Sequence, residues 1–395
     1  MKAATGLMAA TLCVFASQAT AATYDALYAF GDSTVDSGWW QGALATPPQC
    51  DGLATTSCAT GSTGKNTLIS NAIAAGGTPP ANGAPVGAGF MNNVQDLAAK
   101  FGLTANPANQ PGGTDYAISG ALSALAPNLP PNPPSPQIGN LNPNTNLPST
   151  MAQIASFITA HPTGVDASAL YVISSGGNDV TYANTNTNFT TLAQREAFLL
   201  TQATTLATEI SALQTAGAKS IVVYGLQGSG TLPTYMTTQL FNQLTLDHVN
   251  FAGIDIAGLI AAVQAHPGAY DPALITTSLG VVGTLTGSAC VTETGAGSST
   301  TGWGQWCANS NVPSSLHAYL NPNLTNPEQQ ALFTDDQHLS AAGQQIEANF
   351  VFDQITTPLP AALPLFATGI GALGLLGWRR KRKVQAGALP FRNVA

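Results

Sequence analysis

The segment YAFGDSTVDSG, residues 28–38, decides how the fold is predicted, because it joins an apolar run to a turn that contains a serine. The run Ala26–Phe30 is short and uninterrupted, which is typical of a strand buried on both faces of a parallel sheet. Ser33 follows directly after a Gly-Asp pair, so we expect its hydroxyl at the carboxyl end of that strand. The segment is not the Gly-x-Ser-x-Gly elbow of α/β-hydrolases, because Val35 occupies the place of the second glycine.

Similar apolar runs alternate with helical patterns along the chain. The other predicted strands are Tyr116–Ile118, Ala169–Ile173, Ser220–Tyr224 and a weaker one near Asn250–Ile256. The predicted helices are Asn92–Phe101, Thr150–Ala160, Arg195–Ala216 and Ser340–Gln354, with Ser340 as N-cap of the last. The Asn/Thr-rich tract Thr181–Thr191 is predicted as a loop. Strands that alternate with helices predict an α/β fold, with a mostly parallel sheet and helices on both faces.

Functional residues of an open parallel sheet collect at the carboxyl ends of its strands. There the sequence places Ser33 after the first run, Gly120 after the second and Asn178 after the third. Just before the last helix it places Asp335 and His338, three residues apart. We therefore expect these groups to meet at one edge of the sheet.

This set of residues is what acyl transfer requires. A serine hydroxyl is a weak nucleophile until a base such as histidine takes its proton, and the imidazole needs an acceptor that fixes its tautomer. We predict Ser33 as the nucleophile, His338 as general base and acid, and Asp335 as the residue that orients the imidazole. The oxyanion hole would consist of the Ser33 N–H, the Gly120 N–H and the Asn178 side-chain amide.

Four sequence blocks resemble the GDSL, or SGNH, family of lipases and esterases. They are FGDSTVDSG, DYAISGA, GGND and DDQH, which contain Ser33, Gly120, Asn178 and His338 in that order, and the resemblance runs from about residue 24 to 354. It implies a three-layer α/β/α sandwich of flavodoxin-like type with a five-stranded, mostly parallel sheet. Two departures are Asp115, where many members have Asn, and Trp39, where an Asn is frequent.

The composition favours an exported protein and excludes one class of ligand. Charged residues make up 8% of the 395-residue chain, against about 25% in an average protein. Between residues 25 and 353 lie all 19 acidic residues but only Lys65, Lys100, Arg195 and Lys219, which gives 4 − 19 = −15. Because phosphate contacts need clustered Lys or Arg, nucleic acid is not an expected partner.

Both ends of the chain have the pattern of targeting segments. Residues 1–21 combine Lys2, an apolar run and Ala19-Thr20-Ala21, which indicates a secretory signal peptide and a signal peptidase as partner. Residues 357–383 combine an uncharged apolar tract with a basic block, long enough to span a bilayer with the basic end cytoplasmic. We expect the folded domain between them, over residues 22–356, and a short cytoplasmic-side extension over 384–395.

The tract TPLPAALPLFATGIGALGLLGWRRKRK, residues 357–383, resembles PEP-CTERM-type sorting tails, notably the variants that begin Val-Pro-Leu-Pro-Ala. Thr357 replaces the first residue of that pattern. The resemblance implies temporary membrane retention, cleavage by an exosortase-type enzyme, and release to the cell surface or medium. An ordinary tail anchor, which would leave the protein in the membrane, is the alternative.

Four cysteines remain after removal of the signal peptide: Cys50, Cys58, Cys290 and Cys307. An even number in an exported chain suggests disulfides, and four cysteines allow three pairings, of which proximity favours Cys50–Cys58 and Cys290–Cys307. No spacing among them resembles a zinc site, and the GSTGKN segment around Lys65 does not meet the phosphate-loop pattern. We expect no metal and no cofactor.

The sequence thus predicts an exported serine esterase or lipase that hydrolyses carboxylic esters through an acyl-enzyme on Ser33. Acyl transfer to an alcohol and phospholipase action, which the family resemblance also implies, are alternatives. A non-catalytic matrix or polysaccharide-binding protein is an alternative of another class. Trp39 and Trp40, together with Phe90 and Met91, are candidates either for an acyl pocket or for ordinary core packing.

Overall fold

A computed structural model describes residues 23–39, 90–124, 148–270, 290–292, 318–320, 327–334 and 338–356. Residues Thr23–Gln354 make one compact unit, to which the fold below refers. Its centre is a parallel sheet of four strands in the order β1 (Leu27–Gly31), β2 (Leu170–Ser174), β3 (Ser220–Tyr224) and β4 (Phe251–Ile254). A separate antiparallel pair consists of β5 (Cys290–Thr292) and β6 (Ala318–Leu320).

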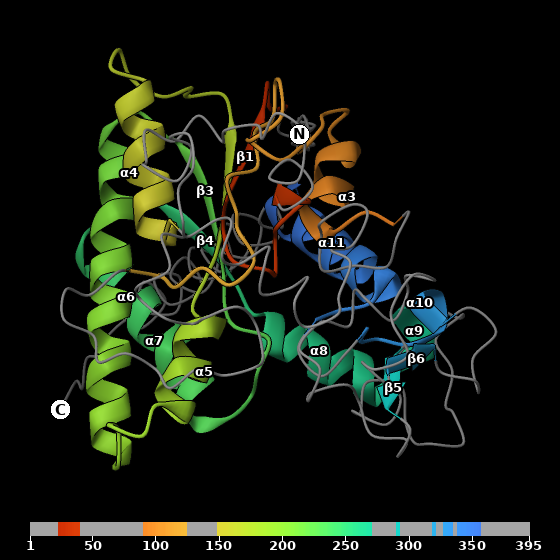
Figure 1. Ribbon diagram of the computed structural model, residues 1–395. Coiled ribbons are helices and arrows are strands. Elements are labelled where there is room, and N and C mark those ends of the chain that lie inside the picture. The colour runs from red at the N-terminus through yellow and green to blue at the C-terminus, as the bar shows by residue number, and fades with distance from the viewer. Residues whose placement is uncertain are drawn as a thin grey trace, which may run out of the picture. The chain divides into compact units, whose positions relative to one another are not determined.

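Helices lie on both sides of this sheet (Figure 1). On one side are α4 (Thr150–Ala160) and α6 (Leu192–Thr215), and on the other are α3 (Asn93–Lys100) and α11 (Ala341–Thr356). The other helices of the described residues are α5 (Gly177–Thr185), α7 (Thr231–Leu246), α8 (Ile256–Ala265), α9 (Pro267–Tyr270) and α10 (Pro327–Gln330). The prediction of an α/β fold with a parallel sheet and helices on both faces is confirmed.

The prediction of five strands is wrong for the described part of the chain, where the sheet has four. The second predicted strand, Tyr116–Ile118, does run beside β1, since the N–H of Tyr116 donates to the carbonyl of Ala29 at 2.8 Å. Only an isolated bridge forms there, between Ala29 and Asp115. The Asp115 carboxylate accepts the N–H of Ala117 at 2.9 Å, and such local side-chain bonds compete with a strand ladder.

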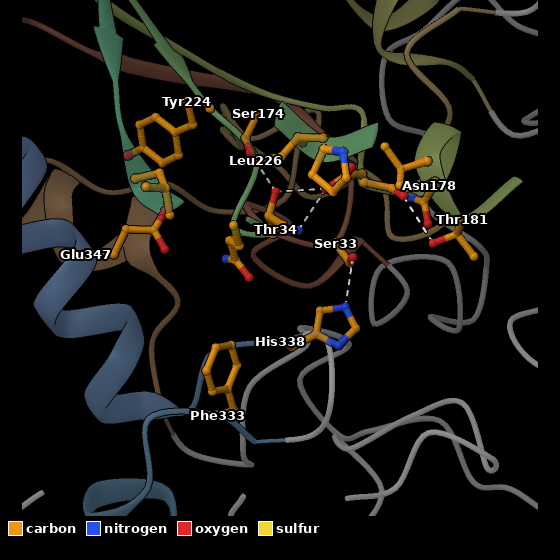
Figure 2. Close-up of a pocket in the computed structure, with 18 residues that line it drawn as sticks. Ser33, Thr34, Ser174, Asn178, Thr181, Tyr224, Leu226, Phe333, His338 and Glu347 are labelled. Atoms are coloured by element: carbon orange, nitrogen blue, oxygen red, sulfur yellow. Dashed lines mark hydrogen bonds between the residues drawn. The ribbon is translucent and has the colours of Figure 1, made fainter. Parts of the chain in front are cut away.

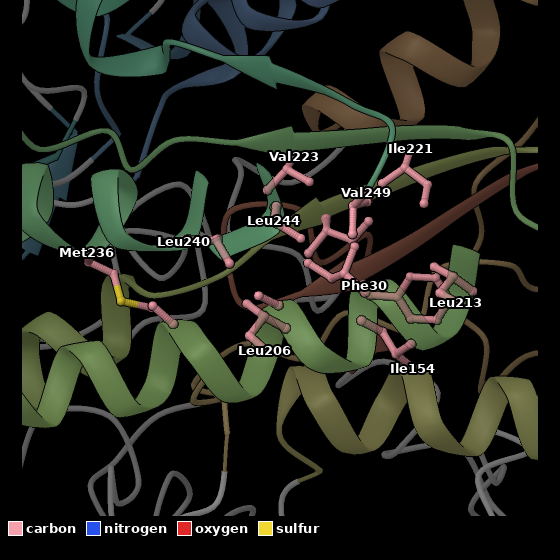
Figure 3. Packing of buried hydrophobic residues seen from close by; sticks show 14 of the residues in the cluster. Phe30, Ile154, Leu206, Leu213, Ile221, Val223, Met236, Leu240, Leu244 and Val249 are labelled. Atoms are coloured by element: carbon pink, nitrogen blue, oxygen red, sulfur yellow. The ribbon is translucent and has the colours of Figure 1, made fainter. Parts of the chain in front are cut away.

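Alternation along the strands gives the sheet two faces, one of which packs on α4, α6 and α7. Phe30, Ile221 and Val223 point into this cluster, where they meet Ile154 of α4, Leu206 and Leu213 of α6, and Met236, Leu240 and Leu244 of α7 (Figure 3). On α6 an apolar stripe with spacings of four, three, four and three residues is fully buried, at Leu199, Ala203, Leu206, Ile210 and Leu213. Burial of this many apolar side chains is the main stabilising contribution to the fold.

Five of the described helices were not predicted. Helices α7, α8, α9 and α10 lie in stretches given no assignment, and α5 occupies part of the tract predicted as a loop. In α5, Thr181 and Thr185 each donate a hydroxyl hydrogen bond to the carbonyl four residues earlier, at 3.1 and 2.8 Å. Because Tyr182 is fully buried on the same helix, packing outweighs the low helix propensity of the Asn and Thr residues.

Two glycines shape the loops that follow β1 and β2. A Cβ at Gly31 would lie 2.0 Å from the carbonyl oxygen of Ser174, so only glycine lets the two strand ends come this close. Gly176 has φ +122°, a left-handed conformation, and it directly precedes α5. These turns bring Ser33 and Asn178 to the same edge of the sheet.

Candidate active site

Ser33 and His338 meet in the structure, although 305 positions separate them along the chain. The Nε2 atom of His338 lies 2.9 Å from the Oγ atom of Ser33 (Figure 2). This is hydrogen-bonding distance for a nucleophile and its general base. The predicted pair is therefore in place, with His338 itself only 7% exposed.

A short turn before α11 holds His338. Phe333 and Leu339 form an isolated antiparallel bridge, and the N–H of Thr334 donates to the carbonyl of His338 at 2.9 Å. The hydroxyl of Ser340 accepts the N–H of Gly343 at 3.2 Å, which agrees with its predicted role as N-cap. Asp335, the predicted orienting residue, lies outside the described residues.

Asn178, the predicted oxyanion donor, is the second residue of α5 and lines the same cavity as Ser33. Its Nδ2 donates to the carbonyl of Ala121 at 2.9 Å, which fixes the orientation of the amide. A side-chain amide has two N–H donors, so one remains for a ligand. Figure 2 shows Asn178 together with Thr181 on one side of Ser33.

Gly120, the other predicted donor, lies between two residues that are tied to the rest of the site. Ser119 is bonded to Asp36 of the first block, and Ala121 is bonded to Asn178 of the third. Within the described residues, the N–H groups of Ser33 and Gly120 donate to no protein acceptor. Gly120 is not among the described residues that line the cavity.

Asp36 is a site residue that the sequence analysis left out. Its Oδ2 accepts the N–H and the hydroxyl of Ser119 at 2.7 and 2.6 Å, and its Oδ1 accepts the N–H groups of Gly38 and Trp39 at 2.8 Å each. Burial raises the pKa of Asp36, and the Ser119 hydroxyl bond is the largest opposing effect. The carboxyl group thus fastens the loop of Ser33 to the loop of Gly120.

Two further buried acids make similar connections between loops. Asp115 accepts the N–H of Ser37 at 2.7 Å, and burial, followed by the nearby charge of Asp36, holds the pKa of Asp115 well above its usual value. Asp179 accepts the N–H and the hydroxyl of Ser123 at 2.9 Å each, and burial raises the pKa of Asp179 to about 7. The first three sequence blocks are therefore connected through enclosed carboxyl groups.

A cavity of about 340 Å³ opens on the Ser33 hydroxyl. Its polar lining includes Asn178, Thr181, Tyr224, Gln227 and Glu347, and its apolar lining includes Val180, Leu226, Pro233, Ile256 and Phe333. Trp39 is buried, whereas Phe90 and Met91 are exposed, and none of the three belongs to this lining. Trp40 lies outside the described residues.

Some predictions concern residues that the structure does not describe or does not test. Cys50, Cys58 and Cys307 lie outside the described residues, as does the tail over 357–383. No helix in the described part of the chain is long and apolar enough to cross a membrane. The same part of the chain contains no group of three or more His, Cys, Asp or Glu residues arranged to hold a metal ion.

Comparison of the sequence with protein-family models gave no match, and neither did comparison with curated proteins.

Proposed function

We propose that the protein is a serine esterase that hydrolyses carboxylic esters through an acyl-enzyme on Ser33. The observation that carries this proposal is the 2.9 Å contact between Ser33 Oγ and His338 Nε2 at the wall of a cavity of about 340 Å³. Asn178 on the same wall supports it, because ester hydrolysis needs a donor for the developing negative charge.

In the first half of the reaction, Ser33 Oγ attacks the ester carbonyl carbon while His338 Nε2 takes the hydroxyl proton. The carbonyl oxygen becomes an oxyanion, which receives a hydrogen bond from the second N–H of the Asn178 amide. When the tetrahedral intermediate collapses, the imidazolium gives its proton to the leaving alkoxide. The products of this half are an alcohol and an acyl group bound to Ser33.

In the second half, water attacks the acyl carbon and His338 takes its proton. Collapse then returns that proton to Ser33 Oγ and releases a carboxylic acid, so the protein is regenerated. An oxyanion donor of this type contributes about 2.7–4 kcal/mol to lowering the barrier. Ser33 and His338 lie on loops, and Asn178 lies in the first turn of α5. The acids Asp36 and Asp179 hold the segments of Ser33 and Asn178 against the loop of Gly120, through Ser119 and Ser123.

We also propose that the fold is the three-layer α/β/α sandwich of the GDSL/SGNH family. The strand-like segment at 115–118 lies beside β1, which gives the order 115–118, β1, β2, β3, β4, as in flavodoxin-like sheets. Export through the signal peptide and processing of the 357–383 tail complete the proposal, on the basis of the sequence patterns alone.

A fluorophosphonate probe tests the catalytic assignment. The wild-type protein should be labelled at Ser33 and should hydrolyse nitrophenyl esters, while Ser33→Ala and His338→Ala should lose roughly 10⁴-fold or more in kcat/KM. Ser168→Ala and His266→Ala, at exposed positions, serve as matched controls and should retain activity. A wild-type protein that takes up no label would exclude the proposed function.

A further inference from the structure

The cavity has a second polar region, which the proposed chemistry does not use. Tyr224 at the end of β3 and Glu347 on α11 lie together on one side of Ser33, away from Asn178 and Thr181 (Figure 2). They line the cavity although only 2% of Tyr224 and 1% of Glu347 is exposed. Gln227, which follows β3 by three residues, lines the same cavity.

Three oxygen atoms of this region are buried and lack a hydrogen-bond partner within the described residues. They are the Tyr224 hydroxyl, Glu347 Oε2 and Gln227 Oε1. Buried polar atoms are almost always paired in folded proteins, so three unpaired ones among the residues that line one cavity require an explanation. Their presence on a cavity wall suggests that a ligand supplies the missing partners.

The fold, and not a chance side-chain rotation, places these groups. Tyr224 alternates with Val223, which points into the cluster on the other face of the sheet, so Tyr224 faces the side on which α11 lies. Glu347 belongs to the buried stripe of α11, next to Ile346 and one turn before Val351. An apolar residue is expected at such a position, since a buried acid without a charged partner is unfavourable.

The protonation state of this region determines which ligand group fits. Burial raises the pKa of Glu347 to about 8, with the Asn93 amide opposing the rise, so the carboxyl group is largely protonated at neutral pH. Burial, followed by the charge of Glu347, holds the pKa of Tyr224 well above its usual value. Both groups can then donate and accept a hydrogen bond, and Gln227 Oε1 can accept one. Among the described residues that line the cavity there is no Lys or Arg to bind an anion.

We propose that Glu347, Tyr224 and Gln227 form a subsite for a hydroxyl group of the substrate, so that the enzyme acts on hydroxyl-bearing esters. The inference rests on the proposed function, because the subsite belongs to the cavity that contains the proposed nucleophile Ser33. A neutral hydroxyl both donates and accepts, which matches a wall of neutral donors and acceptors. Leu226, Ile256 and Phe333 contact the carbon skeleton that carries the hydroxyl.

Two pairs of esters test the subsite on the wild-type protein. Nitrophenyl hydroxybutyrate compared with nitrophenyl butyrate places the hydroxyl on the acyl side, and the glycerol monoester of butyrate compared with propyl butyrate places it on the alcohol side. For at least one pair we expect roughly tenfold or higher kcat/KM for the hydroxyl-bearing ester, because its absence leaves the buried groups unpaired. The pair that shows the preference identifies the side.

Substitutions then connect the preference to these residues. Tyr224→Phe and Glu347→Leu should bring the ratio of kcat/KM within the preferred pair towards one, whereas Tyr235→Phe on α7, which does not line the cavity, should keep the wild-type ratio. Thermal unfolding of each variant shows whether it is folded. The comparison of ester pairs on the wild-type protein does not depend on any variant.

The inference is overturned if neither pair shows a preference in the wild type, or if folded Tyr224→Phe and Glu347→Leu both keep the full ratio. These outcomes differ from failure of the proposed function. If the proposed function is wrong, Ser33 takes up no fluorophosphonate at all. If only the subsite is wrong, the protein is labelled and hydrolyses both members of each pair equally.

Discussion

Asp36 and Glu347 are both enclosed acids close to the candidate active site, yet their surroundings are opposite. Asp36 is 0% exposed and accepts four hydrogen bonds, two on each carboxylate oxygen. Glu347 is 1% exposed, and its Oε2 has no partner among the described residues. Burial raises the pKa of both, so burial alone does not separate their roles.

The difference teaches how to distinguish a structural acid from one available to a ligand. The four donors on Asp36 come from the loops of Ser33 and Gly120, so its carboxylate belongs to the folded scaffold. The unpaired oxygen of Glu347 contributes no such connection, and it lies on a cavity wall. Removing each acid should therefore change stability in opposite directions.

The largest effect is expected for Asp36→Ala. Loss of the carboxylate leaves the N–H groups of Gly38, Trp39 and Ser119 without this acceptor, at about 1–3 kcal/mol for each unsatisfied buried group. We expect the free energy of unfolding to fall by about 3–5 kcal/mol, and esterase activity to fall with it. Chemical denaturation monitored by circular dichroism measures the change.

Asp25→Ala, at an exposed position shortly before β1, is the matched control and should change stability by no more than about 0.5 kcal/mol. The stability of Asp36→Asn should lie between those of these two variants. The amide keeps one acceptor oxygen, but its NH₂ group faces N–H or O–H donors that need an acceptor. If Asp36→Ala were as stable as the wild type, Asp36 would not be the connection between the loops.

The effect of Glu347→Gln should depend on pH. The pKa of Glu347 rises from 4.5 to about 8 on folding, so unfolding releases a proton in this range and stability falls as pH rises. The slope for one such group approaches about 1.4 kcal/mol per pH unit. We expect Glu347→Gln to make the decrease in the free energy of unfolding between pH 5 and 8 less steep. Above pH 8 this variant should be more stable than the wild type.

Part of the slope should remain in that variant, because Asp179, with a pKa of about 7, titrates in the same direction. Glu196→Gln on α6, which does not line the cavity, is the control for a Glu-to-Gln change on a helix. Denaturation curves of the three proteins across the pH range measure the slopes. Equal slopes in all three would show that Glu347 does not keep its proton in the folded protein.

Much of the fold could be predicted because its elements have strong local patterns. Thr150–Ala160 and Ser220–Tyr224 were predicted with the bounds that the structure has. Helix α7 has its own signal in Leu232, Met236, Leu240 and Leu244, which recur every four residues along one side of the helix and are buried. Helix α8 is apolar on almost every side, so periodicity could not separate it from a buried strand.

The candidate site also contains residues that could be predicted from the sequence and residues that could not. Ser33, Asn178 and His338 could be placed from the sequence, because strand ends determine where such residues meet. The hydrogen-bond partners of Asp36 could not be predicted from the sequence, since Ser119 lies 83 positions away and only the folded chain brings the two residues together. Glu347 has no signal of its own in the sequence, since a lone acid on a helix is usually exposed, and only the packing of α11 encloses it.

The smallest effect that still tests the comparison is expected for Asn93→Ala. The Asn93 amide lowers the pKa of Glu347 against the larger effect of burial, so its removal should raise that pKa further. The Asn93 amide also donates to the carbonyl of Thr34 at 3.0 Å, beside the nucleophile, so a modest loss of activity should accompany the shift.

A carbon-13 NMR titration of the Glu347 carboxyl group in both proteins measures the change. Asn188→Ala, in the loop after α5, provides the control. A downward shift of the midpoint in Asn93→Ala would mean that loss of the amide lets water reach the carboxyl group, and that the enclosure of Glu347 depends on Asn93.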